Sequence, residues 1–151
     1  MQAFGAKEVK LLRVFLLVSF TVFFVYIKTA FAGSYCFNKA GNLYGINPKL
    51  LYAVAKVESG FNPQAIDYDK NGSYDFGVMQ INSSWYKVIK PYWNYLANPC
   101  YNVEVGAWIL KNCYKEFHKT VNALECYNSG KPYGDIKYVK KVYLAFKKEG
   151  E

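Results

Sequence analysis

The N-terminal 32 residues differ from the rest of the chain and limit how much of it can form a folded domain. Basic residues at the start precede an apolar run over Val14–Ile27, and Thr29-Ala30-Phe31-Ala32 ends the run with small residues at alternate positions. This order is typical of a secretory signal peptide. We therefore expect a signal peptide at residues 1–32 and a single folded domain at residues 33–151.

The alternative for the same run is an uncleaved membrane anchor. Lys28 interrupts the apolar stretch before it reaches the about 20 residues that span a bilayer. The cleaved leader is therefore preferred, which predicts an exported protein whose contact with the membrane is through the leader only.

The charge of the chain narrows the choice of partners. The formal net charge is +8, and much of the excess lies in a C-terminal block of five lysines: Lys137, Lys140, Lys141, Lys147 and Lys148. Such a block is either a solvated helix face or a surface that attracts an anionic polymer or membrane. Because the chain is predicted to be exported and has no nucleic-acid-binding motif, we expect no nucleic-acid partner.

All four cysteines lie beyond the predicted leader: Cys36, Cys100, Cys113 and Cys126. An even number of cysteines in an exported chain predicts two disulfide bonds, and three pairings are possible on the count alone. Their spacing fits no zinc-binding pattern, and His118 is the only histidine. We therefore expect no metal and no cofactor.

The most informative local pattern is a helix that ends in a carboxylic acid. Asn47-Pro48 provides a capping residue followed by proline at the first helical position, and Gly60 is a typical C-terminal cap. Four residues between them share one helix face: Leu51, Val54, Ala55 and Glu58. A carboxyl group on an apolar face has a raised pKa and can act as a general acid near neutrality. The alternative is that Glu58 pairs with a lysine or turns to solvent.

The remaining pattern predicts a mainly helical (α) domain with one small β-hairpin. Helical runs cover residues 36–44, 100–114, 121–127 and 135–148, and Asn71-Gly72 is a strong hairpin signal within the polar segment 67–75. That segment also resembles the start of a calcium-binding loop, but Val78 occupies the twelfth position, where a bidentate glutamate belongs. The hairpin turn is therefore preferred over a calcium site.

Three motifs in order resemble those of the lytic transglycosylases of glycoside hydrolase family 23, the SLT domain. They are Glu58-Ser59-Gly60, Gly77-Val78-Met79-Gln80-Ile81-Asn82 and Cys126-Tyr127-Asn128-Ser129-Gly130. Pro99-Cys100 and Gly106-Ala107-Trp108-Ile109-Leu110 make the chain similar to the small single-domain members that accompany type III and type IV secretion, pilus and conjugation systems. Val78 stands where the family usually has leucine, and Cys126 where many members have alanine.

The resemblance implies a lysozyme-like α+β fold, with helices around a catalytic cleft, and Glu58 as the catalytic acid. Seven further residues would contribute to the substrate groove: Ser59, Met79, Gln80, Asn82, Tyr127, Asn128 and Tyr138. In this interpretation Met79 forms an apolar wall and Ser59 bonds the Glu58 carboxylate or the substrate. The resemblance also implies a Cys36–Cys100 disulfide, which leaves Cys113 and Cys126 as the second pair.

The activity implied is cleavage of the β-1,4 bond between N-acetylmuramic acid and N-acetylglucosamine in peptidoglycan, with a 1,6-anhydro product. The protein would act in the periplasm of a bacterial cell envelope, with secretion-system or pilus components as further partners. One alternative is a lysozyme-type hydrolase that uses a second carboxylate from Asp67, Asp69 or Asp75. Another is a non-catalytic subunit that binds peptidoglycan.

Overall fold

The computed structural model describes residues 36–149, and the predicted signal peptide lies outside them. A helical segment at residues 36–44 comes first. The elements that follow are α2 (Pro48–Ser59), β1 (Ile66–Tyr68), β2 (Tyr74–Phe76), β3 (Ile81–Asn82), η1 (Ser83–Trp85), α3 (Tyr86–Ile89), η2 (Lys90–Ala97), α4 (Pro99–Phe117), α5 (Thr120–Ser129) and α6 (Ile136–Lys148). Among these described residues no helix is long and apolar enough to cross a membrane.

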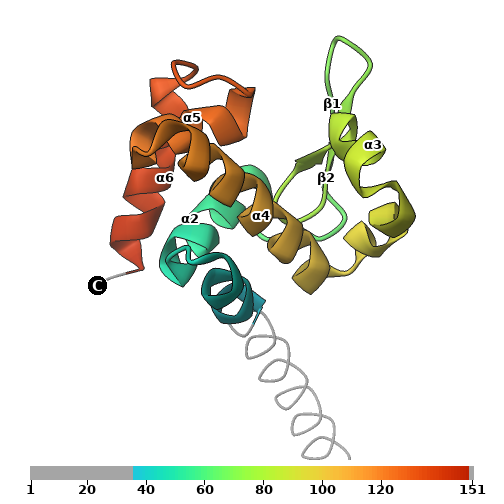
Figure 1. Cartoon of the computed structure of the whole chain (residues 1–151), viewed down its shortest axis with the longest axis horizontal. Coiled ribbons are helices and arrows are strands. Elements are labelled where there is room, and N and C mark those ends of the chain that lie inside the picture. The colour runs from blue at the N-terminus through green and yellow to red at the C-terminus, as the bar shows by residue number, and fades with distance from the viewer. Residues whose placement is uncertain (1–35, 150–151) are drawn as a thin grey trace, which may run out of the picture. The chain divides into compact units, whose positions relative to one another are not determined.

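Helix α4 runs through the middle of the domain (Figure 1). Helices α2, α5 and α6 lie on one side of it, and the small sheet lies on the other side with α3. The buried core extends across α2, α4 and α6, with Leu51, Leu110 and Val142 among its fully buried side chains. The expectation of a mainly helical, lysozyme-like domain is confirmed.

The helix that carries Glu58 begins and ends where its capping residues predict. The Asn47 side chain accepts a hydrogen bond from the backbone N–H of Lys49 at 2.9 Å, and Pro48 is the first helical residue. Gly60 closes α2 in the left-handed conformation, with φ 60°, and its N–H bonds the carbonyl of Lys56. The short helix therefore has a defined end at which Glu58 is placed.

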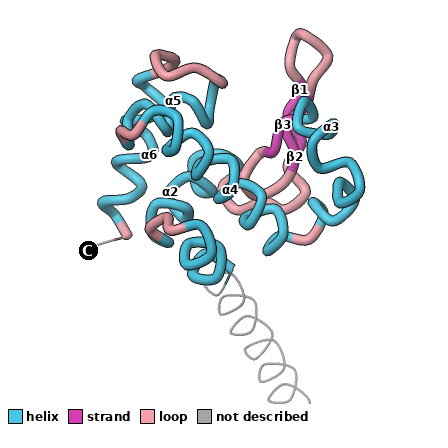
Figure 2. Tube along the Cα trace, in the orientation of Figure 1, coloured by secondary structure: helices cyan, strands magenta, loops and turns pink. Residues whose placement is uncertain are grey.

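The sheet has three antiparallel strands in the order β1-β2-β3 (Figure 2). The predicted hairpin is confirmed as β1 and β2, which pair Asp67 with Asp75 across the turn around Gly72. The third strand was not predicted. It pairs Asp75 with Asn82, so the end of the Gly77–Asn82 motif forms an antiparallel strand beside the hairpin.

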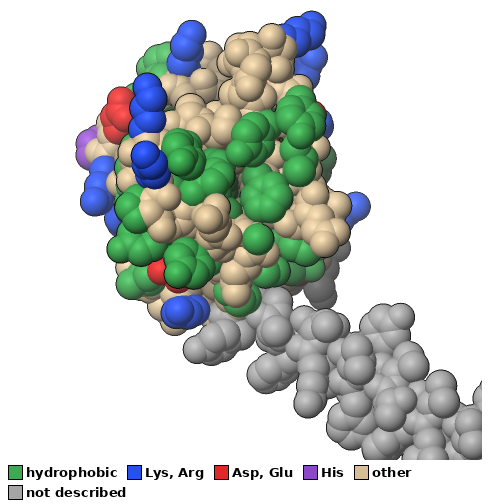
Figure 3. Space-filling model, turned by 90° about the vertical axis from the view of Figure 1, so that its right-hand side faces the viewer, with side chains coloured by type: hydrophobic (Ala, Val, Ile, Leu, Met, Phe, Trp, Pro, Cys, Tyr) green, Lys and Arg blue, Asp and Glu red, His purple; other side chains and the backbone are tan. Residues whose placement is uncertain are grey.

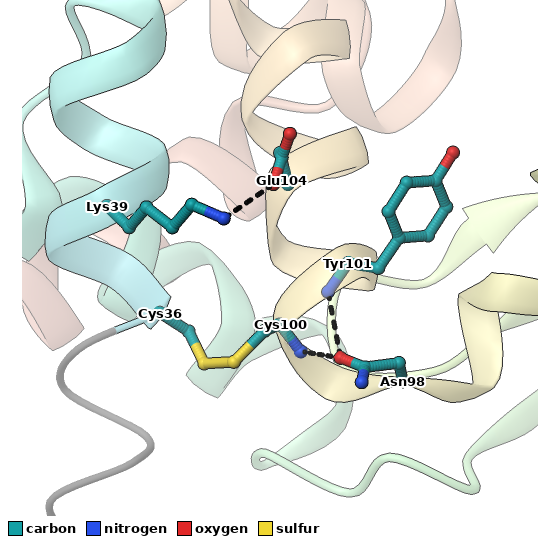
Figure 4. The surroundings of a disulfide bond; sticks show 6 residues. All are labelled: Cys36, Lys39, Asn98, Cys100, Tyr101 and Glu104. Atoms are coloured by element: carbon teal, nitrogen blue, oxygen red, sulfur yellow. Dashed lines mark hydrogen bonds and ion pairs between the residues drawn. A yellow bond between two sulfur atoms is a disulfide. The ribbon is translucent and has the colours of Figure 1, made fainter.

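Both predicted disulfide pairings are confirmed. Cys36–Cys100 joins the first helical segment to the start of α4 (Figure 4). The Asn98 side chain caps that start by accepting hydrogen bonds from the N–H groups of Cys100 and Tyr101. The second bond, Cys113–Cys126, joins α4 to α5 over a sequence separation of 13. Each bond therefore anchors one end of α4 to another helix.

A fully buried amide on α4 holds the backbone that precedes β3. Asn102 Oδ1 accepts a hydrogen bond from the N–H of Met79 at 2.7 Å. Its Nδ2 donates to the carbonyls of Phe76 at 3.0 Å and Leu96 at 3.3 Å. A buried amide whose donors and acceptor are all engaged stabilises the fold, because its removal leaves buried backbone groups without this partner.

We expect Asn102→Ala to lower the free energy of unfolding by about 2–4 kcal/mol, because it leaves buried backbone groups unpaired. Urea denaturation followed by circular dichroism measures the change. The control is Asn94→Ala, because Asn94 is an exposed residue of η2. Equal midpoints for the two variants would contradict the role given to Asn102.

Candidate active site

A cleft of about 610 Å³ opens between the sheet and the helices. Its walls come from the end of α2, from the hairpin and β3, from the second half of α4 and from the end of α5. Glu58, Gln80, Asn82, Tyr127 and Asn128 all line it. The structure thus brings together, in one cleft, residues from each of the three sequence motifs.

The Glu58 carboxyl is half-buried and has a strongly perturbed pKa. Burial raises this pKa, and the negative charge of Asp75 raises it further. A hydrogen bond from Tyr138 acts in the opposite direction, and the net result is a pKa of about 7. The ordinary value is 4.5, so at neutral pH a large share of the molecules carry a proton on this carboxyl group.

Tyr138 on α6 supplies the hydrogen bond to this carboxyl. Its hydroxyl donates to Glu58 Oε1 at 2.5 Å, and the ring is buried on the apolar face that α6 turns toward α2. Burial and then the charge of Glu58 raise the pKa of the Tyr138 hydroxyl well above its ordinary value. The hydroxyl therefore stays protonated and remains a donor to Glu58.

Side chains from three helices hold the backbone of residues 77–80, which forms one wall of the cleft. Ser59 Oγ donates to the carbonyl of Val78 at 2.8 Å, and Tyr127 Oη donates to the carbonyl of Met79 at 2.7 Å. Asn102 of α4 accepts a hydrogen bond from the N–H of Met79, which lies between these two carbonyls in the chain. Gly77 has φ 81°, and a Cβ at this position would collide with the Asn102 amide, so only glycine fits.

The backbone of Gln80 has a conformation that residues other than glycine rarely adopt. Its backbone φ is 48°, in the left-handed region. Its Nε2 donates to the carbonyls of Gly77 at 2.8 Å and Ala65 at 3.3 Å. These bonds, together with the hydrogen bonds that hold the Met79 backbone, fix the position of Gln80, whose side chain lines the cleft.

Two predicted site residues take other places in the structure. Met79 was expected to form an apolar wall for the substrate, but its side chain is fully buried and packs against Gly106 of α4. Ser59 was expected to bond the Glu58 carboxylate or the substrate, whereas its hydroxyl bonds the Val78 carbonyl. Neither residue is among those that line the cleft, and both contribute to the packing and hydrogen bonding that hold the backbone next to Gln80.

The acids of the hairpin form a hydrogen-bonded group beside Glu58. Asp69 and Asp75 line the cleft, and Asn82 Nδ2 donates to Asp75 Oδ1 at 2.9 Å and to Asp69 Oδ2 at 3.2 Å. Burial raises the pKa of Asp75; the bond from Asn82 lowers it, and the charges of Asp69 and Asp67 raise it. Within residues 36–149, histidine, cysteine and acidic side chains form no cluster suited to hold a metal ion.

Several cleft residues were missed by sequence reasoning. Trp85 follows β3, and Asn112 and Glu116 lie one turn apart on α4. Asn102, which supports the wall, also lies on α4. The sequence signal for Asn102 is weak, because Asn102 directly precedes the mostly apolar run 103–110 and that run also contains the charged Glu104.

Comparison with known proteins agrees with this architecture. Residues 35–146 match the model of the transglycosylase SLT domain, so the chain belongs to that family. The chain is 33% identical to the "Peptidoglycan-binding-like protein" of Escherichia coli O157:H7, over 92% of each chain. It is 37% identical to "Invasion protein IagB" of Salmonella typhimurium, over 81% of this chain and 80% of that one. It is 33% identical to "Protein IpgF" of Shigella flexneri, over 74% and 78%.

Proposed function

We propose that this protein is an exported lytic transglycosylase that cleaves peptidoglycan, with Glu58 as both acid and base. The observation that carries the proposal is the half-buried Glu58 carboxyl, whose pKa of about 7 lets it hold a proton in an open cleft. Efficient general acids have a pKa near the working pH. Membership of the SLT family supports peptidoglycan as the substrate.

The proposed reaction uses one carboxyl group twice. Protonated Glu58 gives its proton to the glycosidic oxygen between N-acetylmuramic acid and N-acetylglucosamine, and the bond from that oxygen to C1 of the muramic residue breaks. The C6 hydroxyl of the same residue then bonds C1, and its proton passes to the Glu58 carboxylate. The product is a 1,6-anhydro sugar, no water is consumed, and Glu58 is again protonated. An intramolecular nucleophile of this kind can have an effective concentration of about 10⁵ M or more.

The residues around Glu58, both those that line the cleft and the buried Tyr138 behind it, have roles that follow from their positions. Tyr138 stabilises the carboxylate form of Glu58 between the two proton transfers, because its hydroxyl remains a donor throughout. Gln80, Asn82 and Asn128 line the cleft and would hydrogen-bond the hydroxyl and acetamido groups of the glycan. Tyr127 secures the wall that presents Gln80.

The cellular setting is proposed from three features. The predicted signal peptide and the two disulfides favour export to an oxidising compartment, which for a peptidoglycan enzyme is the bacterial periplasm. One similar protein carries the name "Invasion protein IagB". These features support the proposal that the enzyme acts beside a secretion or pilus apparatus, where it would open the cell wall locally.

A lysozyme-type hydrolase is the second candidate, because Asp75 lines the same cleft and its charge raises the pKa of Glu58. In that reaction two carboxylates take part and water supplies the nucleophile. The products separate the two candidates. A transglycosylase leaves muramic ends that are lighter by one water than the reducing ends that a hydrolase leaves.

We expect Glu58→Gln to remove glycan cleavage while keeping the fold, because glutamine has a similar shape and no proton of suitable acidity. Loss of a general acid costs roughly 10²-fold or more in rate. Mass spectrometry of digested sacculi measures both the amount and the kind of ends, and the unchanged protein should give anhydro ends. Near-normal turnover by Glu58→Gln would show that another group is the acid.

We expect Asp75→Asn to keep most of the activity at mildly acidic pH and to shift the alkaline limb of the pH–rate profile to lower pH. The reason is that removal of a neighbouring negative charge favours the Glu58 carboxylate and so lowers the Glu58 pKa. The pH dependence of kcat/KM measures the shift. Loss of activity at every pH, in folded protein, would favour the two-carboxylate mechanism.

Tyr138→Phe should shift the alkaline limb of the pH–rate profile to higher pH, opposite to the shift expected for Asp75→Asn. Without the hydroxyl the Glu58 carboxylate loses its donor, so its pKa rises and activity persists to higher pH. The maximal rate should fall, because the carboxyl is no longer held in place. The same kcat/KM profile tests this, and shifts of Asp75→Asn and Tyr138→Phe in the same direction would contradict the assignment of Glu58 as the titrating acid.

A further inference from the structure

A second hollow, of about 350 Å³, lies beside the first half of α4. Four of its lining side chains are aromatic: Tyr44, Tyr92, Tyr101 and Trp108. The Glu104 carboxylate adds a charged group. These residues come from the first helical segment, from η2 and from α4, so three separate parts of the chain build the hollow.

The surface that includes η2 is unusually apolar. Figure 3 views the molecule from the side that carries α3, where hydrophobic side chains gather into a broad exposed area. Tyr86 and Val88 of α3, together with Tyr92 and Tyr95 of η2, are exposed large hydrophobic residues. Tyr92 is 57% exposed, so its ring face is accessible to a ligand.

The hollow adjoins the cleft along one side of α4. Val105 and Trp108 line the hollow, and the residues four positions further on, Ile109 and Asn112, line the cleft. Residues four apart lie one above the other on a helix. The two cavities therefore occupy successive stretches of the same side of α4, whose 19 residues give it a length of about 28 Å.

A pair of tryptophans connects the two cavities. Trp85 lines the cleft and Trp108 lines the hollow. Their rings are in edge-to-face contact, with centroids 5.3 Å apart and planes at 71°. One polymer that lies along α4 would therefore contact one wall of each cavity.

The lining groups suit a sugar ring. The apolar C–H faces of a pyranose pack against aromatic rings, while the hydroxyls and acetamido groups need hydrogen-bond partners at the edges. Burial, and then the charge of Glu104, raise the pKa of the Tyr44 and Tyr101 hydroxyls, which remain donors. The Glu104 carboxylate offers acceptor oxygens to sugar hydroxyls and is held by an ion pair with Lys39 at 3.7 Å (Figure 4).

We propose that this aromatic hollow is an accessory glycan-binding site that holds an N-acetylhexosamine segment of the strand whose cleavable bond lies in the cleft. The proposal rests on the proposed function and adds to it. It makes the enzyme selective for strands long enough to occupy both cavities. The hollow contributes binding only, because Glu58 is not among the residues that line it.

The test uses full-length Glu58→Gln protein, so that binding is measured without cleavage. The probes are a hexamer and a dimer of β-1,4-linked N-acetylglucosamine, followed by calorimetry and by the NMR signals of the Trp85 and Trp108 indole N–H groups. The hexamer should shift both indole signals. Adding Tyr92→Ala should weaken hexamer binding roughly tenfold, a loss of about 1.4 kcal/mol, and should leave dimer binding in the cleft unchanged.

Two matched variants control for structural damage. Tyr92→Phe keeps the ring and should bind the hexamer as the unchanged hollow does. Tyr143→Ala removes a ring of similar exposure, 54%, from α6 and should have no effect. A hexamer that shifts only Trp85, or that binds the Tyr92→Ala and Tyr143→Ala proteins equally, would overturn the accessory site. That result would leave the proposed reaction intact, because the reaction is judged by the products of the unchanged enzyme.

Discussion

The hydrogen bond from Tyr138 to Glu58 joins two residues that are 80 positions apart, and the candidate active site depends on it. Burial raises the Glu58 pKa, and this bond limits the rise and orients the carboxyl. The bond can form only because α6 packs against α2. The last helix of the domain is therefore part of the site, although most cleft residues precede it in sequence.

The rest of the fold keeps in position the backbone of residues 77–80, which carries Gln80 into the cleft lining. Ser59, Asn102 and Tyr127 reach the backbone of residues 77–80 from α2, α4 and α5. The Cys113–Cys126 disulfide ties α5 to α4 immediately before Tyr127. Because Ser59 is the neighbour of Glu58, the same helix end holds both the acid and the backbone of residues 77–80. Such shared supports give a small domain a rigid site.

Much of this could be predicted from sequence, because local signals and motifs were strong. Asn47, Pro48 and Gly60 predicted the bounds of α2, and Asn71-Gly72 predicted the hairpin. Strand β3 was missed because two residues carry no periodicity. A motif also does not say which way a side chain points, so Met79 was placed in the groove although it is buried. Asn102 and the aromatic hollow were missed because distant segments assemble them. The signal peptide stays a prediction.

The central claim is that Glu58 is a carboxyl with a pKa near neutrality. A ¹³C NMR titration of the Glu58 side-chain carboxyl measures this directly in the unchanged protein, with the resonance assigned by its loss in Glu58→Gln. We predict a midpoint of about 7. A midpoint near the ordinary value of 4.5 would show that the carboxyl is ionised at neutral pH, and would contradict its role as the acid.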